Sequence, residues 1–213
     1  MRRKQTPTPD PMPTPKAPGG RPRKYTDEKL VDAALRVMER EGYHALTIRS
    51  LAQELGTSHS TLYNYVGHVE DIEAQALHKL TAQLPQPIAS TAAALRKELL
   101  AYLVAARRLL VQHPGVLFPP VGSTAFLTLF EIGEQWIKAL LPHAEDEKSA
   151  RLGLGSLMAL VVVTAERERV YGGEDAARIR TLGVPARFES LEEALDALMS
   201  LVLPGLGRRR KTR

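Results

Sequence analysis

The chain has 213 residues, of which 44% are apolar, and it contains no cysteine, which excludes disulfides and thiolate metal sites. Its formal charge of +5 is unevenly spread: residues 25–207 hold 17 basic and 23 acidic side chains, so the expected folded body is acidic and the two tails are basic. The longest apolar run, residues 157–165, is shorter than a membrane span, and no apolar signal segment follows the basic N-terminus. These features predict a cytoplasmic protein with no membrane partner.

Residues 1–24 are predicted to form a disordered basic arm. Seven of the fifteen prolines lie in the first 22 residues, and such a sequence favours extended, solvated backbone over a packed core. The last segment, residues 205–213, is a second basic tail. Its expected role is that of a solubilising end that attracts phosphate only weakly.

Helical periodicity begins after Thr26, which is predicted to cap a first helix that ends at Gly42. A second helix is expected over residues 48–55 and a third from residue 59 to about residue 66. Gly56, between them, is expected to adopt a positive φ. The residues expected to cap helix N-termini in this region are Thr47, Ser58 and Thr61.

The remaining elements are also predicted to be helices, and no segment alternates with a period of two for long enough to indicate a strand. The expected fold class is therefore all-α. Apolar periodicity, prolines and glycines place the later helices at about residues 69–84, 90–112, 123–141, 145–171 and 190–202.

Two short helices joined by a turn with glycine, after a stabilising first helix, form the layout of a helix-turn-helix. The segment from residue 46 to residue 71, LTIRSLAQELGTSHSTLYNYVGHVED, resembles the DNA-binding domain of the TetR family almost position by position, and the resemblance extends over residues 26–80. It implies a helix-turn-helix domain over residues 25–68, a linking helix over 69–84, and an effector-binding and dimerisation domain over 85–204. It further implies a repressor that binds a palindromic double-stranded DNA operator as a homodimer and is released by a small-molecule effector.

The outer face of the third helix and the caps beside it form the predicted DNA-binding surface. Asn64 has the hydrogen-bonding groups to pair with adenine, and the resemblance implies a phosphate contact for Tyr63. Arg49, near the start of the second helix, is expected to reach a guanine edge or a phosphate. The full set of predicted DNA-binding residues is Arg21, Arg23, Lys24, Thr47, Arg49, Ser58, His59, Ser60, Thr61, Tyr63, Asn64 and Tyr65.

The sequence departs from the TetR pattern at positions that bear on phosphate binding. Val66 stands where the family commonly has phenylalanine, and Val69 stands where it often has a phosphate-binding lysine. Residues 25–68 hold four basic and six acidic side chains, a poor balance for neutralising phosphates. We therefore hypothesise that residues at the end of the N-terminal arm enter the minor groove beside the recognition helix, namely Arg21, Arg23 and Lys24.

The helices expected near residues 145–171 and 190–202 are predicted to pair with their symmetry mates in a four-helix dimer interface. The first of them is apolar nearly all round, and its small residues, among them Gly153 and Gly155, permit close helix approach. A monomeric bundle is the alternative.

A small apolar or amphipathic effector is expected to bind between the helix at residues 90–112 and the helix at residues 123–141. No phosphate loop, nucleophile elbow or metal-ligand spacing is present in the sequence, so neither an enzyme nor a cofactor is expected. The competing interpretations are a C-terminal half that recognises a protein or only dimerises, and activation in place of repression. The predicted ligand-binding residues are Tyr102, Ala106, His113, Phe118, Phe126, Phe130, Glu131 and Trp136, with Arg107 and Thr128 as further polar candidates.

Overall fold

The computed structural model describes residues 25–171 and 191–206, and within them it contains eight α-helices and no β-strand, which confirms the all-α prediction. The predicted arm at residues 1–24 and the tail from residue 207 lie outside the described residues. The helices are α1 (Asp27–Glu41), α2 (Ile48–Glu54), α3 (His59–Tyr63), α4 (Val69–Thr81), α5 (Ala92–Gln112), α6 (Thr124–Leu140), α7 (Glu147–Tyr171) and α9 (Leu191–Val202), with 3-10 turns η1 (Tyr43–Ala45), η2 (Leu141–His143) and η3 (Pro204–Leu206).

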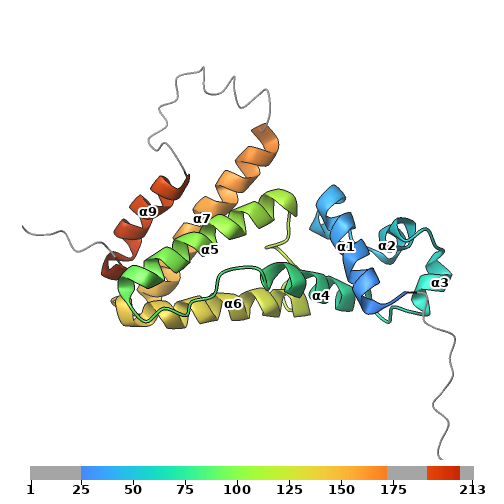
Figure 1. Cartoon of the computed structure of the whole chain (residues 1–213), viewed down its shortest axis with the longest axis horizontal. Helices are drawn as coiled ribbons and strands as arrows, with labels where there is room; N and C mark the ends of the chain where they lie inside the picture. The colour runs from blue at the N-terminus through green and yellow to red at the C-terminus, as the bar shows by residue number, and fades with distance from the viewer. Residues whose placement is uncertain (1–24, 172–190, 207–213) are drawn as a thin grey trace, which may run out of the picture.

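The molecule is elongated, with α1, α2 and α3 at one end and α9 toward the other (Figure 1). Between them, α5, α6 and α7 form a helical bundle in which α5 packs against both α7 and α9. The linking helix α4 packs against α1 and against α6, so it contacts both parts of the molecule. The short helices α2 and α3 therefore stand at one tip, away from the bundle.

Side-chain caps mark the helix starts. The Thr26 hydroxyl accepts the N–H of Lys29 at 3.4 Å at the start of α1, as predicted. Thr47 and Ser58 cap α2 and α3 in the same way. The predicted capping role of Thr61 is wrong, because α3 already begins two residues earlier and places Thr61 inside the helix. Its hydroxyl instead forms a hydrogen bond with the Ser58 hydroxyl at 2.9 Å.

Two helices end earlier than predicted. α3 ends at Tyr63, where the N–H of Asn64 donates to the carbonyl of Thr61 in a tight i to i+3 turn. α4 ends at Thr81, and the chain then turns over residues 82–84, where the N–H of Leu84 donates to the carbonyl of Thr81 at 3.0 Å, before it reaches Pro85. Apolar spacing continues past both ends, so periodicity alone overestimates the lengths of these helices.

α7 supplies buried apolar side chains to the bundle core, notably Leu157 and Val161. Its stretch Glu147–Val170 is long and apolar enough, by length and composition alone, to cross a membrane, although the apolar run within it is short. One such helix is weak evidence for a membrane span, since the core helix of a bundle passes the same test. Here α7 packs along α5 and also contacts α6 and α9.

A buried charge fastens α9 to α5. The guanidinium of Arg96 donates to the carboxylate of Asp196 at 2.9 Å and to the carbonyl of the same residue at 2.7 Å. It also donates to the Ser200 hydroxyl at 2.8 Å and to the carbonyl of Leu206 at 3.3 Å. Arg96 thus donates hydrogen bonds to acceptors on α9 and on η3 at the same time, which holds the last described segment against the bundle.

Candidate nucleic-acid interface and effector site

A small apolar core holds α2 and α3 together at the tip of the molecule. Leu51 and Ala52 of α2 and Leu62 of α3 are buried. In the turn between the helices Gly56 has a φ of 60°, which confirms the predicted positive φ. The N–H of Thr57 donates to the carbonyl of Ala52 at 2.9 Å, so the direction in which α3 leaves α2 is fixed by backbone as well as by packing.

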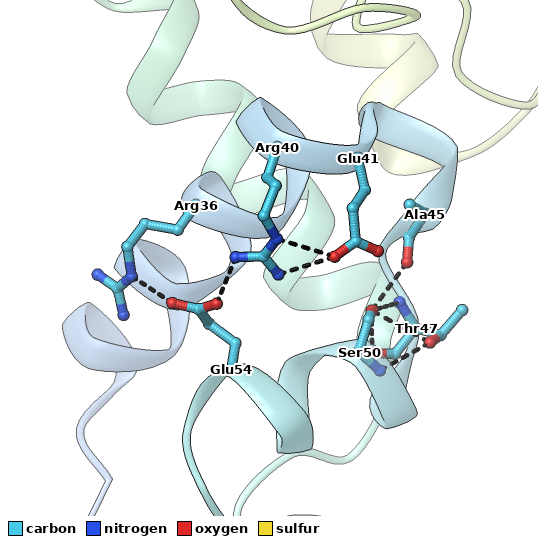
Figure 2. A network of polar contacts seen from close by, with 7 residues as sticks. All are labelled: Arg36, Arg40, Glu41, Ala45, Thr47, Ser50 and Glu54. Atoms are coloured by element: carbon cyan, nitrogen blue, oxygen red, sulfur yellow. Dashed lines mark hydrogen bonds and ion pairs between the residues drawn. The ribbon is translucent and has the colours of Figure 1, made fainter.

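Glu54, at the end of α2, lies between two arginines of α1 (Figure 2). It accepts a hydrogen bond from Arg36 Nε at 2.6 Å and another from Arg40 Nη1 at 2.8 Å. The hydrogen bond from Arg36, then that from Arg40, lowers the pKa of Glu54 below its ordinary value. Glu41 also accepts from Arg40. This group, the Glu54 clamp, ties α2 to α1 and engages both arginines.

Thr47 and Ser50 form a capping box at the start of α2 (Figure 2). Thr47 Oγ1 accepts the N–H of Ser50 at 3.0 Å, and Ser50 Oγ accepts the N–H of Thr47 at 2.9 Å. Ser50 Oγ also donates to the carbonyl of Ala45 at 2.8 Å. The start of α2 is therefore bound to η1, the turn that precedes it.

The outer face of α3 is exposed and polar. His59, Ser60, Tyr63 and Asn64 are all exposed, Tyr63 by 63%, and Arg49 is exposed near the start of α2. The side chain of Asn64 donates to the carbonyl of Ser60 at 3.2 Å, which holds it along the helix. The described surface of α3 carries no acidic residue. The spacing of the four exposed residues 59, 60, 63 and 64 places them on one side of α3, where they can meet a polyanion.

Two other predicted DNA-binding residues have local structural contacts. The Ser58 hydroxyl bonds to those of Ser60 and Thr61, at 3.0 and 2.9 Å, at the start of α3. Tyr65 is only half-exposed, and its ring packs edge-on against Tyr25 with centroids 5.2 Å apart. Helical spacing alone does not reveal this contact, because Tyr25 belongs to the segment before α1.

The charge available to DNA in α1–α3 is small. Of the four basic side chains in residues 25–68, Arg36 and Arg40 are engaged by Glu54. Lys29 and Arg49 form no ion pair within the part of the chain that the structure describes. The predicted basic residues of the arm, Arg21, Arg23 and Lys24, lie outside the described residues.

In the bundle, Tyr102 of α5 and Trp136 of α6 pack together with ring centroids 4.9 Å apart. Trp136 is fully buried, and burial raises the pKa of Tyr102 to about 12. Ala106 and His113 follow Tyr102 on α5 and the turn after it, and both are buried. The Trp136 indole N–H and His113 Nδ1 have no hydrogen-bond partner within residues 25–171 and 191–206. Unpartnered buried polar atoms are rare in native proteins, so each of these two atoms marks a position for a further hydrogen-bond partner.

The other predicted effector residues lie nearer to solvent. Phe118 and Phe130 are 54% and 53% exposed, and Glu131 is exposed. Phe130 stacks on the half-buried Phe126 with centroids 6.5 Å apart. Of the predicted set, the structure therefore brings Tyr102 and Trp136 into contact. It leaves Phe118, Phe130 and Glu131 on the surface of the described chain.

A groove of about 480 Å³ lies at the junction of α1, α4 and α6. Of the residues proposed from sequence, only Thr128 lines it. The others come from three elements far apart in the sequence and have ordinary surface or core side chains, so no local signal identifies them. They include Val31, Ala74, Gln75, His78 and Thr124.

α7 and α9 expose large apolar side chains. Leu152 and Val163 of α7 are 67% and 61% exposed, and Leu201 of α9 is 76% exposed. Leu152, Ala159 and Val163 recur at helical spacing, so they form one stripe along α7. We call these exposed residues of α7 and α9 the apolar stripe.

The two glycines singled out on α7 have different surroundings. A Cβ at Gly153 would lie 2.7 Å from the Leu203 side chain and 3.2 Å from the Val202 carbonyl oxygen, so this small residue is used where α9 ends against α7. A Cβ at Gly155 would meet nothing within 4 Å. Only Gly155 therefore remains open to close approach by another molecule.

Comparison with known proteins identifies a family model and relatives that this chain resembles in sequence. The family model for bacterial regulatory proteins of the tetR family matches residues 30–66. An uncharacterised HTH-type transcriptional regulator of Mycobacterium tuberculosis is 46% identical over 52 residues, which are 24% of this chain and 24% of that protein. An HTH-type transcriptional regulator of Saccharopolyspora erythraea is 31% identical over 162 residues, 73% of this chain and 66% of the relative. The chain thus spans about a quarter of the first relative and just under two thirds of the second.

Solved structures share the fold at low sequence identity. A TetR variant of Acinetobacter baumannii in complex with minocycline has a TM-score of 0.58 and 17% identity, over 87% of this chain and 100% of that one. BioQ with its double-stranded DNA operator has a TM-score of 0.53 and 17% identity, over 86% and 98%. The matched helix-turn-helix, the relative that is similar along most of the chain and the shared fold agree: the chain belongs to the TetR family of bacterial regulatory proteins.

Proposed function

We propose that the protein is a DNA-binding transcriptional regulator that represses by occupying a palindromic operator as a homodimer. The observation that carries this proposal is the exposed face of α3, where His59, Ser60, Tyr63 and Asn64 present hydrogen-bonding groups; Arg49 of α2 is also exposed. A short helix with a polar, acid-free outer face suits the major groove, where every base pair offers a distinct pattern of donors and acceptors. BioQ, which shares the fold, has been solved with its operator.

The contacts around α2 support this function because base recognition requires a helix held in a fixed position. The Glu54 clamp joins α2 to α1, and the capping box of Thr47 and Ser50 joins it to η1. An interface whose side chains are already oriented loses less entropy on binding than one that must be ordered. Phosphate contacts then set the register, and the α3 side chains read bases.

The proposal extends to the N-terminal arm. Because Arg36 and Arg40 are engaged by Glu54, much of the attraction to phosphate has to come from outside α1–α3. Arg21, Arg23 and Lys24 directly precede the described chain and would line the minor groove. Deleting residues 1–24 is expected to weaken DNA binding and to flatten its dependence on salt. Unchanged affinity and an unchanged salt slope would contradict the role of the arm.

Dimerisation through the apolar stripe is part of the same proposal. An exposed row of large apolar side chains such as Leu152, Val163 and Leu201 marks a protein interface. A two-fold axis through α7 and α9 would present two α3 helices to paired half-sites, which is how one short helix per subunit gains specificity.

The effector is proposed to be a small apolar or amphipathic molecule that binds beside Tyr102 and Trp136. The buried neighbours of Tyr102 along α5 are apolar, and the unpartnered indole N–H offers a directional hydrogen bond; His113 Nδ1, at the end of α5, is a second proposed contact. A neighbour in fold, the TetR variant of Acinetobacter baumannii, has been solved with minocycline. A ligand that prefers the conformation with misplaced α3 helices would shift the population away from DNA. Ala106, Phe118, Phe126, Phe130 and Glu131 remain proposed contacts of this ligand.

The DNA-binding proposal is tested by fluorescence anisotropy with DNA that flanks the protein's own gene, at several salt concentrations. Saturable, salt-dependent binding to a short palindrome is expected. Asn64→Ala is expected to cost about 1–3 kcal/mol, the range for one good base contact. The control is Arg169→Ala, which removes a side chain paired with Glu166 on α7, outside the helix-turn-helix, and should bind DNA as the parent does. Binding no tighter than to random DNA would contradict the proposal and favour a C-terminal half that recognises a protein.

The effector site is tested through the single tryptophan of the chain. Because Trp136 is the only tryptophan and lies against Tyr102, its fluorescence reports on the proposed site alone. A ligand of this site should shift the emission and release the DNA over the same concentration range. A ligand that releases the DNA without changing Trp136 emission would place the effector elsewhere, for instance in the groove at the junction of α1, α4 and α6.

A further inference from the structure

The turn between α5 and α6 touches the helix-turn-helix directly. The backbone N–H of Tyr43, in η1, donates to the carbonyl of Pro114 at 2.8 Å. Tyr43 and Pro114 are separated by α2, α3, α4 and α5 in the sequence. This hydrogen bond therefore connects the two parts of the molecule at a place that does not include α4.

The two segments approach each other closely both at Gly42 and at Gly115. A Cβ added to Gly42 would lie 3.4 Å from the Pro114 carbonyl oxygen. A Cβ added to Gly115 would lie 3.2 Å from the ring of His44 and 3.6 Å from Cβ of Tyr43. Gly115 has a φ of 83°, a conformation that residues with a Cβ rarely adopt.

Part of the contact is buried, although Pro114 and Gly115 are half-buried and His44 is exposed. Tyr43 is 1% exposed, and His113 and Val116 on the other side are buried. Burial raises the pKa of the Tyr43 phenol and lowers that of the His113 imidazole, as removal from water does for each of these groups. Because a backbone hydrogen bond and buried side chains join the two segments here, a shift of one segment disturbs its contacts with the other.

Each side of the contact leads to one of the proposed sites. His113 caps the end of α5, with its N–H donating to Leu109, and α5 carries Tyr102. On the other side η1 is bound to the start of α2 by the hydrogen bond from Ser50 Oγ to the Ala45 carbonyl. The path from the helix that carries Tyr102 to α2 thus consists of packed segments joined by backbone hydrogen bonds and by the Ser50 side chain.

We propose that the turn at residues 113–115 is a second joint between the bundle and the helix-turn-helix, through which a displacement of the end of α5 changes the position of α2 and α3 without passing through α4. The proposal rests on the proposed DNA-binding function. In this joint Pro114 supplies the acceptor, Tyr43 supplies the donor, and Gly115 allows the approach of His44. The joint adds a second element that biases the DNA-binding conformation, beside the packing of α4 on α1 and α6.

The test compares Gly115→Ala with Gly122→Ala. Gly122 lies in the same connection between α5 and α6 and has a φ of 85°, but a Cβ there would meet nothing within 4 Å. Both variants carry the strain of a Cβ at positive φ, and only Gly115→Ala pushes against His44. We expect Gly115→Ala to bind operator DNA at least about fivefold more weakly, the lower end of typical coupling between sites, and Gly122→Ala to bind as wild type does.

A second variant and a second measurement complete the test. His44→Ala introduced into Gly115→Ala removes the ring that the new Cβ meets, so it should restore affinity to the level of Gly122→Ala, even if the single variant is poorly folded. Amide hydrogen exchange at Tyr43 and across α2 should be faster in Gly115→Ala than in Gly122→Ala. Equal affinity and equal exchange in the two glycine variants would overturn the joint. If wild-type protein binds no operator, the proposed function fails, and exchange at Tyr43 and in α2 alone then decides the joint.

Discussion

The two ends of the molecule distribute polar and apolar side chains in opposite ways. In α1–α3 the apolar side chains, such as Leu51 and Leu62, are buried, and the hydrogen-bonding groups of α3 face outward. In the bundle the charge of Arg96 is buried, while Leu152 and Leu201 are exposed. The first end buries its apolar side chains within itself, and its polar surface suits a polyanion. The second end has a surface that is complete only when another apolar surface covers it.

The largest expected effect comes from adding charge to the apolar stripe. Leu152→Glu should leave the subunit folded, because Leu152 is 67% exposed, but it should dissociate the dimer. Each buried leucine contributes about 1.5–3 kcal/mol, and the two-fold axis applies the loss twice. Analytical ultracentrifugation measures the result. Leu127→Glu, which charges an exposed leucine on α6, is the matched control. A dimer that withstands Leu152→Glu would show that the stripe is not the interface.

A second comparison sets a buried aromatic of the bundle against an exposed aromatic of α3. Trp136→Ala should lower the free energy of unfolding by about 3–5 kcal/mol, because it leaves a cavity beside Tyr102. Tyr63→Ala removes a side chain that is 63% exposed and should change stability by no more than about 0.5 kcal/mol, while it weakens DNA binding. Urea denaturation and anisotropy measure the two effects. Similar losses of stability would refute the assignment of opposite roles.

These opposite distributions also explain what the sequence could predict. The helix-turn-helix is specified by local rules: Thr47 and Ser58 cap, Gly56 turns, and Leu51 and Leu62 repeat at helical spacing. All of these lie within a short segment, so the elements, their order and the exposed face follow from the sequence. The ends of the helices are predicted less accurately from the sequence, since apolar spacing continues past the last helical hydrogen bond in α3.

The sites of the bundle depend on contacts that local rules do not contain. Arg96 meets Asp196 a hundred residues away, and Tyr102 meets Trp136 on another helix. The sequence placed Tyr102 and Trp136 in one predicted site but did not separate them from Phe130, which is also aromatic and is exposed. The close approach at Pro114 is equally invisible in the sequence, because a backbone carbonyl has no residue signature.

A smaller effect is expected from the buried charge of the bundle. Arg96→Ala removes the donors for Asp196, Ser200 and the Leu206 carbonyl, and an unsatisfied buried acceptor costs about 1–3 kcal/mol. Arg49→Ala, which removes an exposed arginine of α2, should leave the unfolding free energy almost unchanged. Urea denaturation of the two variants measures the difference. An equal effect of both substitutions would contradict a fastening role for Arg96.

The smallest effect on stability is expected at the Glu54 clamp, because ion pairs with exposed arginines contribute little to the free energy of unfolding. Hydrogen bonds from Arg36 and then Arg40 lower the pKa of Glu54 in the folded protein. Its carboxylate therefore stabilises the fold above the pKa of glutamate in an unfolded chain, about 4.3, and the contribution is lost as the pH falls through the lower folded pKa. Wild type and Glu54→Gln should differ in unfolding free energy at neutral pH and converge in acid.

Glu54→Gln also tests how much positive charge α1–α3 offer to DNA, because it removes one negative charge and is expected to change stability little. Glu54→Gln removes the carboxylate partner of Arg36 and one of the two carboxylate partners of Arg40, which keeps Glu41. If these arginines then reach phosphates, DNA binding should become more dependent on salt, since each neutralised phosphate releases a counterion and steepens the slope. A salt slope equal to that of wild type would show that the clamp withholds no charge from DNA, and that the acidic balance of α1–α3 must be offset by the arm alone.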